Sequence, residues 1–148
     1  MKFSCNTVIM LPKARVIELF NNPDNLVHWQ DGFIKFEHLE GTPGAVGSKS
    51  LMSYKVNNKA LDITETILVN NLPHEFTGLY ECAPMTNTMQ NLFEELSANE
   101  TKYVANIEYT QLNGIMVKIM AFLFPGMFKK QVKKWMDQFK DFAENADK

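Results

Sequence analysis

The chain has 148 residues and a net charge of −2, with 45% hydrophobic and 22% charged residues. This composition predicts one globular domain, residues 1–148, that buries a core without disulfide or metal staples, and it excludes disordered, collagen-like and coiled-coil classes. The net charge argues against a nucleic-acid binder, and the two cysteines, which lack metal-ligand spacing, favour a reducing compartment that we expect to be the cytoplasm.

The first thirty residues predict a strand followed by two short helices. Residues 2–10 alternate as a strand does, and Pro12 stands where the first turn of a helix can begin. The segment that follows has an apolar face and ends at Asn21-Asn22-Pro23. Asp24 can cap a second short helix that runs through Trp29.

From residue 33 onward the apolar residues alternate with a period of two, which predicts six more strands. Turn residues separate these strands, and Asn57-Asn58 is typical of a hairpin. Hairpin-length connections favour an antiparallel sheet. The predicted strands cover residues 33–39, 48–56, 59–69, 74–82, 87–97 and 101–111.

The remainder, residues 113–146, is predicted to be helical. Its second half has one apolar helical face, formed by Phe128, Val132, Trp135, Phe139 and Phe142. Residues 115–128 are apolar nearly all round, so we expect them to be covered on more than one side. A helix of this length measures about 21 Å, too short for a bilayer core of about 30 Å, so no transmembrane segment is expected. Pro125-Gly126 should kink or break the helix.

This order of elements predicts an α+β fold, in which a long C-terminal helix lies across a curved antiparallel sheet of about seven strands. Short motifs occur along the whole chain: Pro12, Asn25-Leu26-Val27-His28-Trp29, the glycine-rich loop 41–48, Glu65-Thr66-Ile67 followed by Leu72-Pro73, and the segment 139–144. Together they resemble the START-like superfamily, also called SRPBCC or polyketide cyclase/dehydrase-like, which includes the birch-pollen allergen. The resemblance implies a helix-grip fold and, for most members, a hydrophobic small molecule or lipid bound between sheet and helix. A minority of members are enzymes, so the fold leaves the function open.

Glu65 is the most informative candidate residue. The strand face that it shares with residues 61, 63, 67 and 69 is otherwise apolar. A carboxylate that faces an apolar interior is costly unless it is paired, hydrogen-bonded or protonated. Glu65 therefore predicts a polar anchor for a ligand, or a general acid or base with a raised pKa. A local bulge, or hydrogen bonds to neighbouring Tyr or Asn side chains, would also explain it.

The predicted cavity lies between the concave sheet and residues 116–135. Tyrosine hydroxyls on the strand faces would orient the polar end of a ligand, although ordinary core tyrosines give the same pattern. Residues 87–97 alternate ambiguously, and we place Met89 and Phe93 inward with Asn91 as a polar contact. The predicted ligand-binding residues are Met52, Tyr54, Glu65, Ile67, Phe76, Tyr80, Met89, Asn91, Phe93, Met116, Met120 and Phe124.

No catalytic residue, metal site or cofactor is predicted. The three histidines, His28, His38 and His74, are far apart in the sequence and lack partners at metal-site spacing. The serines lack the context of a nucleophile elbow.

Three functions remain open. The leading hypothesis is a non-enzymatic carrier or sensor of a hydrophobic small molecule. The second is a cyclase, dehydratase or isomerase with Glu65 as base and a tyrosine as hydrogen-bond donor, which ranks lower because only one titratable group is convincing. The third is an interaction module acting through the basic C-terminal helix, with weak contact to anionic membranes. Residues 118–148 carry seven Lys and four acidic residues, although a solvated helix face would also account for this charge. The sequence indicates no particular ligand or oligomeric state.

Overall fold

A computed structural model describes all residues, 1–148. The strands are β1 (Lys2–Ile9), β2 (Phe33–Glu40), β3 (Lys49–Val56), β4 (Lys59–Asn71), β5 (Glu75–Cys82), β6 (Met85–Ser97) and β7 (Glu100–Leu112). The helices are α1 (Lys13–Phe20), the 3-10 turn η1 (Pro23–Asn25), α2 (Leu26–Trp29), α3 (Ile115–Leu123) and α4 (Gly126–Asn145). The predicted strand, short helices, six strands and C-terminal helical region all occur in this order.

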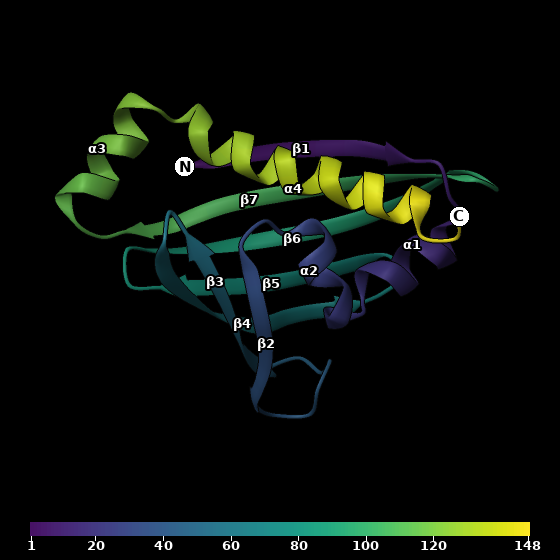
Figure 1. The fold of residues 1–148 in the computed structure, drawn as a ribbon, viewed down its shortest axis with the longest axis horizontal. Helices are drawn as coiled ribbons and strands as arrows, with labels where there is room; N and C mark the ends of the chain where they lie inside the picture. Colours follow the sequence, from purple (N-terminus) through teal and green to yellow (C-terminus); the bar gives the residue numbers. More distant parts are fainter.

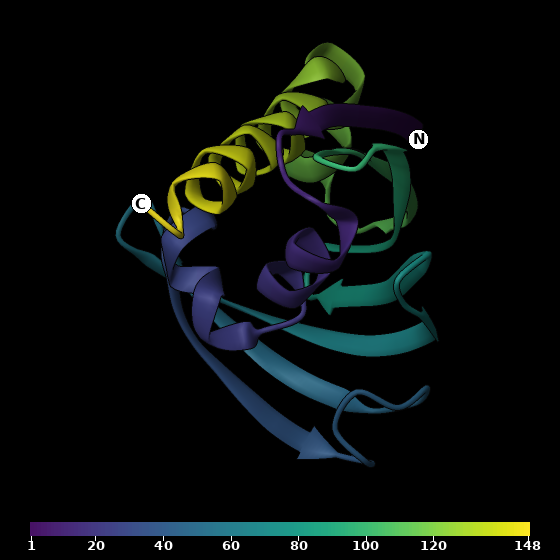
Figure 2. The same cartoon turned by 90° about the vertical axis from the view of Figure 1, so that its right-hand side faces the viewer.

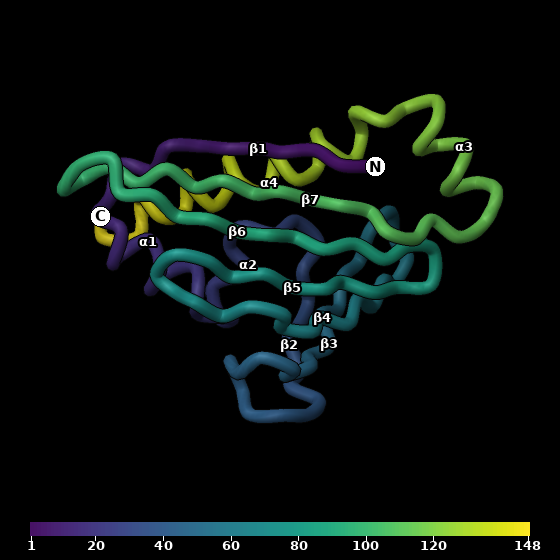
Figure 3. Tube along the Cα trace, turned by 180° about the vertical axis from the view of Figure 1, so that it is seen from behind, coloured from purple at the N-terminus to yellow at the C-terminus, as the bar shows by residue number.

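The seven strands form one antiparallel sheet in the order β1–β7–β6–β5–β4–β3–β2. Figure 2 shows that this sheet curves strongly around α1 and α2. The long helix α4 packs against β1 and α2, and so closes the concave side (Figure 1). No helix covers the convex face, which is seen from behind in Figure 3. The predicted α+β helix-grip architecture is therefore confirmed.

Local sequence explains the turn between β3 and β4. Asn57 and Asn58 join β3 to β4, and both have positive φ angles, 50° and 63°. A two-residue turn of this conformation matches the right-handed twist of the strands, and Asn is one of the few residues that adopt it readily. The predicted hairpin is thus present, and it fixes the register of β3 on β4.

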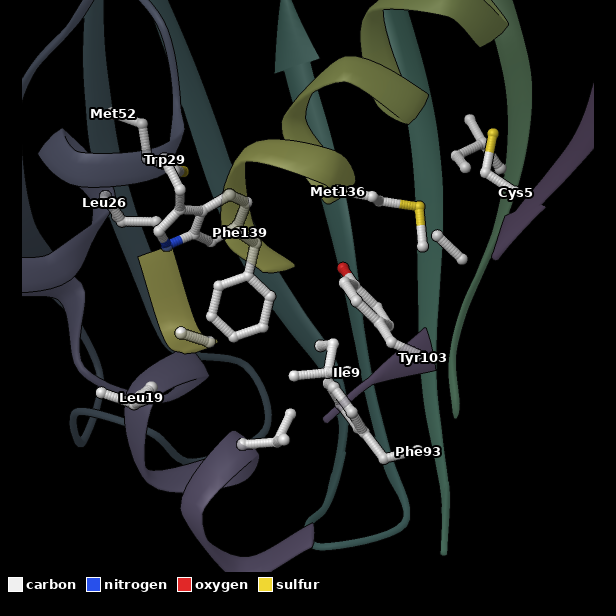
Figure 4. Packing of buried hydrophobic residues seen from close by; sticks show 14 of the residues in the cluster. Cys5, Ile9, Leu19, Leu26, Trp29, Met52, Phe93, Tyr103, Met136 and Phe139 are labelled. Carbon is white, nitrogen blue, oxygen red and sulfur yellow. The ribbon is translucent and has the colours of Figure 1, made fainter. Parts of the chain in front are cut away.

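The hydrophobic core lies at one end of the concave face, beneath α4 and between the sheet and the N-terminal helices. Figure 4 shows Met136 and Phe139 pointing from α4 toward Trp29 and Tyr103. The ring centroid of Phe139 lies 5.1 Å from that of Trp29 and 6.0 Å from that of Tyr103. Phe139 is fully buried, so this contact anchors the long helix to the rest of the fold.

The C-terminal helical region differs from expectation in one respect. The helical region is interrupted at Pro125, as predicted, and this break separates α3 from α4. The expectation that residues 115–128 are covered on more than one side is wrong, because no residue of α3 is buried. Figures 1 and 3 show why: α3 projects beyond the end of the sheet. None of the helices combines the length and apolar character needed to span a bilayer.

Candidate functional site

A cavity of about 800 Å³ lies between the concave face of the sheet, the N-terminal helices and α4. Most of its lining side chains are hydrophobic. Ligand pockets for small molecules have volumes of roughly 300–1,000 Å³ and the same mainly apolar character. The fold therefore encloses a space large enough for an apolar small molecule.

Strand periodicity directs the lining side chains. Alternate residues of β3 to β7 point to the concave face, because successive side chains of a strand point to opposite sides of the sheet. On β4, the alternating residues Leu61, Ile63, Glu65 and Ile67 line the cavity. From the other side, α4 contributes Phe128, Gln131, Val132, Lys134, Trp135 and Met136.

The register of the sheet places six polar side chains in one line across the cavity wall. Residues opposite one another on neighbouring strands are His38 and Ser50, Ser50 and Glu65, Glu65 and Tyr80, Tyr80 and Asn87, and Asn87 and Tyr109. All six line the cavity, and we call them the polar row. The polar row crosses a wall in which hydrophobic residues are the majority.

Glu65 is the one carboxyl group in the polar row. It is 9% exposed, and the Tyr80 hydroxyl donates a hydrogen bond of 2.8 Å to its Oε2. Burial raises the pKa of Glu65, and the hydrogen bond from Tyr80 opposes that rise. Burial, followed by the charge of Glu65, raises the pKa of Tyr80 well above its ordinary value. Glu65 Oε1 forms no hydrogen bond within the protein, so it is the free polar atom of this pair.

Gly78 makes room for the Tyr80 ring. A Cβ atom at Gly78 would lie 2.7 Å from the Tyr80 hydroxyl oxygen and 2.8 Å from two carbons of the ring. Contacts this short are not tolerated between non-bonded atoms, so a larger residue would displace the ring. The glycine thus allows the geometry in which Tyr80 reaches Glu65.

Two further polar side chains of the cavity, those of Tyr54 and Asn91, are hydrogen-bonded within the protein. The Tyr54 hydroxyl donates to Gln30 Oε1 at 2.6 Å, and the Tyr54 ring stacks on Trp135 at 5.7 Å. Asn91 donates to the Phe76 carbonyl at 3.1 Å and accepts a hydrogen bond of 2.6 Å from Tyr103. Burial raises the pKa of both tyrosines, which keeps their hydroxyls neutral. These groups stabilise the wall, whereas Glu65 retains a free acceptor.

Eight of the twelve predicted binding residues line this cavity: Met52, Tyr54, Glu65, Ile67, Phe76, Tyr80, Met89 and Asn91. Their role in binding stays a prediction.

The other four lie outside the cavity, so their predicted positions need correction. Phe93 is buried in the core, with its ring stacked on Tyr103 at 4.9 Å, because the inward face of β6 continues past the cavity. Met116, Met120 and Phe124 are 71%, 37% and 60% exposed, because α3 projects away from the sheet. The break at Pro125 removes them from the helix that covers the cavity.

Sequence reasoning also missed part of the wall. Leu26, Trp29 and Gln30 of the α2 region line the cavity from below α4. Phe128, Val132 and Trp135 lie within residues 116–135, which are predicted to cover the cavity, but they are not among the predicted ligand-binding residues. No group of three or more His, Cys, Asp or Glu side chains lies close enough to hold a metal ion.

Solved structures share this fold along the full length of the chain. A protein from Thermus thermophilus, TTHA0849, superposes with a TM-score of 0.80 at 12% identity, covering 100% of both chains. Zhui aromatase/cyclase from Streptomyces sp. R1128 gives a TM-score of 0.82 at 12% identity, covering 100% of this chain and 96% of that one. Ara h 8.0201 gives 0.74 at 9% identity, covering 97% of each.

Searches against protein-family models and curated proteins found no match. The likeness to solved structures therefore rests on the arrangement of elements. It agrees with the fold expected from the sequence motifs, and the chain has the helix-grip fold.

Proposed function

We propose that the protein binds and carries a hydrophobic small molecule or lipid in the cavity, without converting it. The observation that carries the proposal is a mainly apolar cavity of about 800 Å³ that is crossed by the polar row. Burial of about 400 Å² of apolar ligand surface would contribute about 10 kcal/mol before the costs of association. Such a site suits a ligand with an apolar body and one polar end.

The chemistry of Glu65 limits the kinds of polar end that we expect the ligand to have. Burial favours the neutral form of this carboxyl, and its Oε1 is free of protein partners. A neutral carboxyl can donate a hydrogen bond to a ligand carbonyl or hydroxyl, whereas a ligand anion would meet a buried acidic group. We therefore expect a neutral polar end, and weaker binding of a fatty-acid carboxylate than of the corresponding alcohol.

Native mass spectrometry of freshly purified protein, combined with organic extraction, tests the proposal directly. A discrete added mass that disappears on denaturation would support it and give the chemical class of the ligand. A bare polypeptide that stays bare after incubation with mixed lipids and aromatic compounds would count against it.

A pair of substitutions tests the location. Met89 lines the cavity and Met120 does not, so Met89→Trp narrows the space while Met120→Trp leaves it unchanged. With the neutral fluorophore N-phenyl-1-naphthylamine, we expect at least about fivefold weaker binding for Met89→Trp, since overfilling forces the probe or the wall to move. Met120→Trp should bind like the wild type. Undiminished binding by Met89→Trp would contradict the proposed site.

One observation favours a second candidate, an acid–base enzyme of the cyclase or dehydratase type. Glu65 and Tyr80 form a hydrogen-bonded pair of titratable groups within the cavity, and an aromatase/cyclase shares the fold. Glu65→Gln separates the two candidates. A carrier retains most of its affinity for a neutral ligand, whereas an enzyme loses turnover of the extracted compound.

A further inference from the structure

Helix α3 exposes most of its large apolar side chains. Ile115, Met116 and Phe122 are 77%, 71% and 85% exposed, and Leu123 and Phe124 are more than half exposed. No strand or helix packs extensively on α3, which projects beyond the end of the sheet (Figure 1). A contiguous apolar surface of this kind marks a site of interaction, because monomeric soluble proteins seldom expose one.

The exposed side chains form a broad face. At about 100° per residue, the exposed apolar residues of α3 span an arc of roughly 160° around the helix. Lys118 lies just beyond the edge of this arc, next to Phe122. A wide apolar face with a lysine at its border suits a helix that lies in a lipid interface, where the lysine stem follows the apolar surface and its ammonium reaches the headgroups.

Lysines occur in α3 and in the first turns of α4 that follow it. Residues 113–136 contain five lysines and no acidic residue. Lys133 and Lys134 pair with Asp137 and Asp31, but Lys118, Lys129 and Lys130 form no salt bridge. All three are exposed. Unpaired cations beside an apolar face complement anionic headgroups above an acyl phase.

We propose that α3 docks the protein on an anionic phospholipid membrane, with its apolar face inserted among the acyl chains and Lys118, Lys129 and Lys130 at the headgroups. The helix is about 14 Å long, so it lies in the interface and does not cross the bilayer. A second copy of the chain is a poorer occupant, because pairing two α3 faces would bring two sets of unpaired lysines together.

Docking would bring one end of the cavity to the membrane. The chain enters α3 shortly after Tyr109 and leaves it shortly before Phe128, and both residues line the cavity. Their ring centroids are 5.0 Å apart. An apolar ligand could thus pass between bilayer and cavity over a short path. The docking surface itself is independent of ligand binding in the cavity.

Vesicle co-sedimentation of the full chain tests the proposal. We expect binding to vesicles of phosphatidylcholine with about 30% phosphatidylglycerol, weak binding to phosphatidylcholine alone, and a decline as salt rises from about 0.05 to about 0.5 M. Phe122→Asp should weaken binding at least about tenfold, because it places a charge among the acyl chains. Its matched control is Leu96→Asp, which adds the same charge at an exposed residue of β6 near the β6–β7 turn, at the opposite end of the molecule.

Two further variants separate charge from insertion. Lys129→Gln with Lys130→Gln should weaken binding to anionic vesicles and leave binding to neutral vesicles unchanged. Phe122→Trp should add a fluorescence signal that brominated acyl chains quench, beyond the quenching of Trp29 and Trp135 in the wild type.

Three results would overturn the proposal. They are the absence of sedimentation with anionic vesicles, equal sedimentation of Phe122→Asp and the wild type, and a wild-type dimer that Phe122→Asp dissociates in the absence of any vesicle binding. The last result would assign α3 to a protein interface. Probe binding in the cavity is measured separately, so failure of docking and failure of the carrier function are distinguishable.

Discussion

Gly78→Ala tests the geometry that holds the polar pair of the cavity. The new methyl group would lie 2.7 Å from the Tyr80 hydroxyl oxygen, so the ring must move and its hydrogen bond to Glu65 is lost. Loss of that bond, with the buried carboxyl left unpartnered, costs about 1–3 kcal/mol. Alanine in a strand offsets about 0.5–1 kcal/mol of this relative to glycine. The midpoints of these two ranges give a net destabilisation of about 1 kcal/mol.

The assay combines urea unfolding, followed by tryptophan fluorescence, with binding of N-phenyl-1-naphthylamine. Gly78→Ala pushes the Tyr80 ring toward the cavity, so it should lower both stability and probe affinity. Tyr80→Phe removes only the hydroxyl, so it should lower stability and leave probe affinity close to that of the wild type. Gly126→Ala is the control, because a Cβ there meets no atom within 4 Å. Wild-type stability and affinity in Gly78→Ala would refute this account of the Glu65–Tyr80 pair.

Two other predictions concern stability. Burial raises the pKa of Glu65 in the folded protein, so the native state holds its proton to higher pH than the unfolded chain. The unfolding free energy of the wild type should therefore fall as pH rises from the ordinary carboxyl value through the folded one, and Glu65→Gln should lack this decline in urea titrations between about pH 4 and pH 8. Phe139→Ala should destabilise the fold by about 3–5 kcal/mol, because the ring is fully buried against Trp29 and Tyr103. Phe122→Ala, at an 85% exposed ring, should change the unfolding free energy by less than about 0.5 kcal/mol.

The elements could be predicted from sequence because the deciding signals are local. Asn57 and Asn58 set the turn between β3 and β4, and the alternation of residues on either side sets the face of each strand. Pro125 breaks the C-terminal helix because it has no backbone N–H to donate and its ring clashes with a carbonyl of the preceding turn. Each of these effects depends on a few neighbouring residues.

The side chains that line the cavity could be predicted only where the alternation within a single strand determines which residues face inward. Glu65 and Ile67 face the cavity as the alternation on β4 indicates, but a register shift between Ile67 and Val69 ends that pattern. Val69 is 36% exposed as a result. Phe93 continues the inward face of β6 into the core, because α1 rather than open space lies over it there. What covers an inward residue depends on helices distant in sequence, and periodicity carries no information on it.

The error at α3 has a different origin, and it bears on the proposed docking. The nearly continuous apolar residues at 115–128 correctly indicated a segment that is stabilised by removal from water. The stabilisation is about 1.5–3 kcal/mol for each large side chain that is fully buried. In the structure, no other part of the chain buries the residues of α3. The folded chain leaves Ile115, Met116 and Phe122 in water, so it lacks the stabilisation that their burial would give unless another molecule covers them. The unpaired lysines near α3 in the sequence complement anionic headgroups, and acyl chains can cover the apolar side chains. The apolar segment that the sequence predicts to be buried is therefore an argument for docking on a membrane surface.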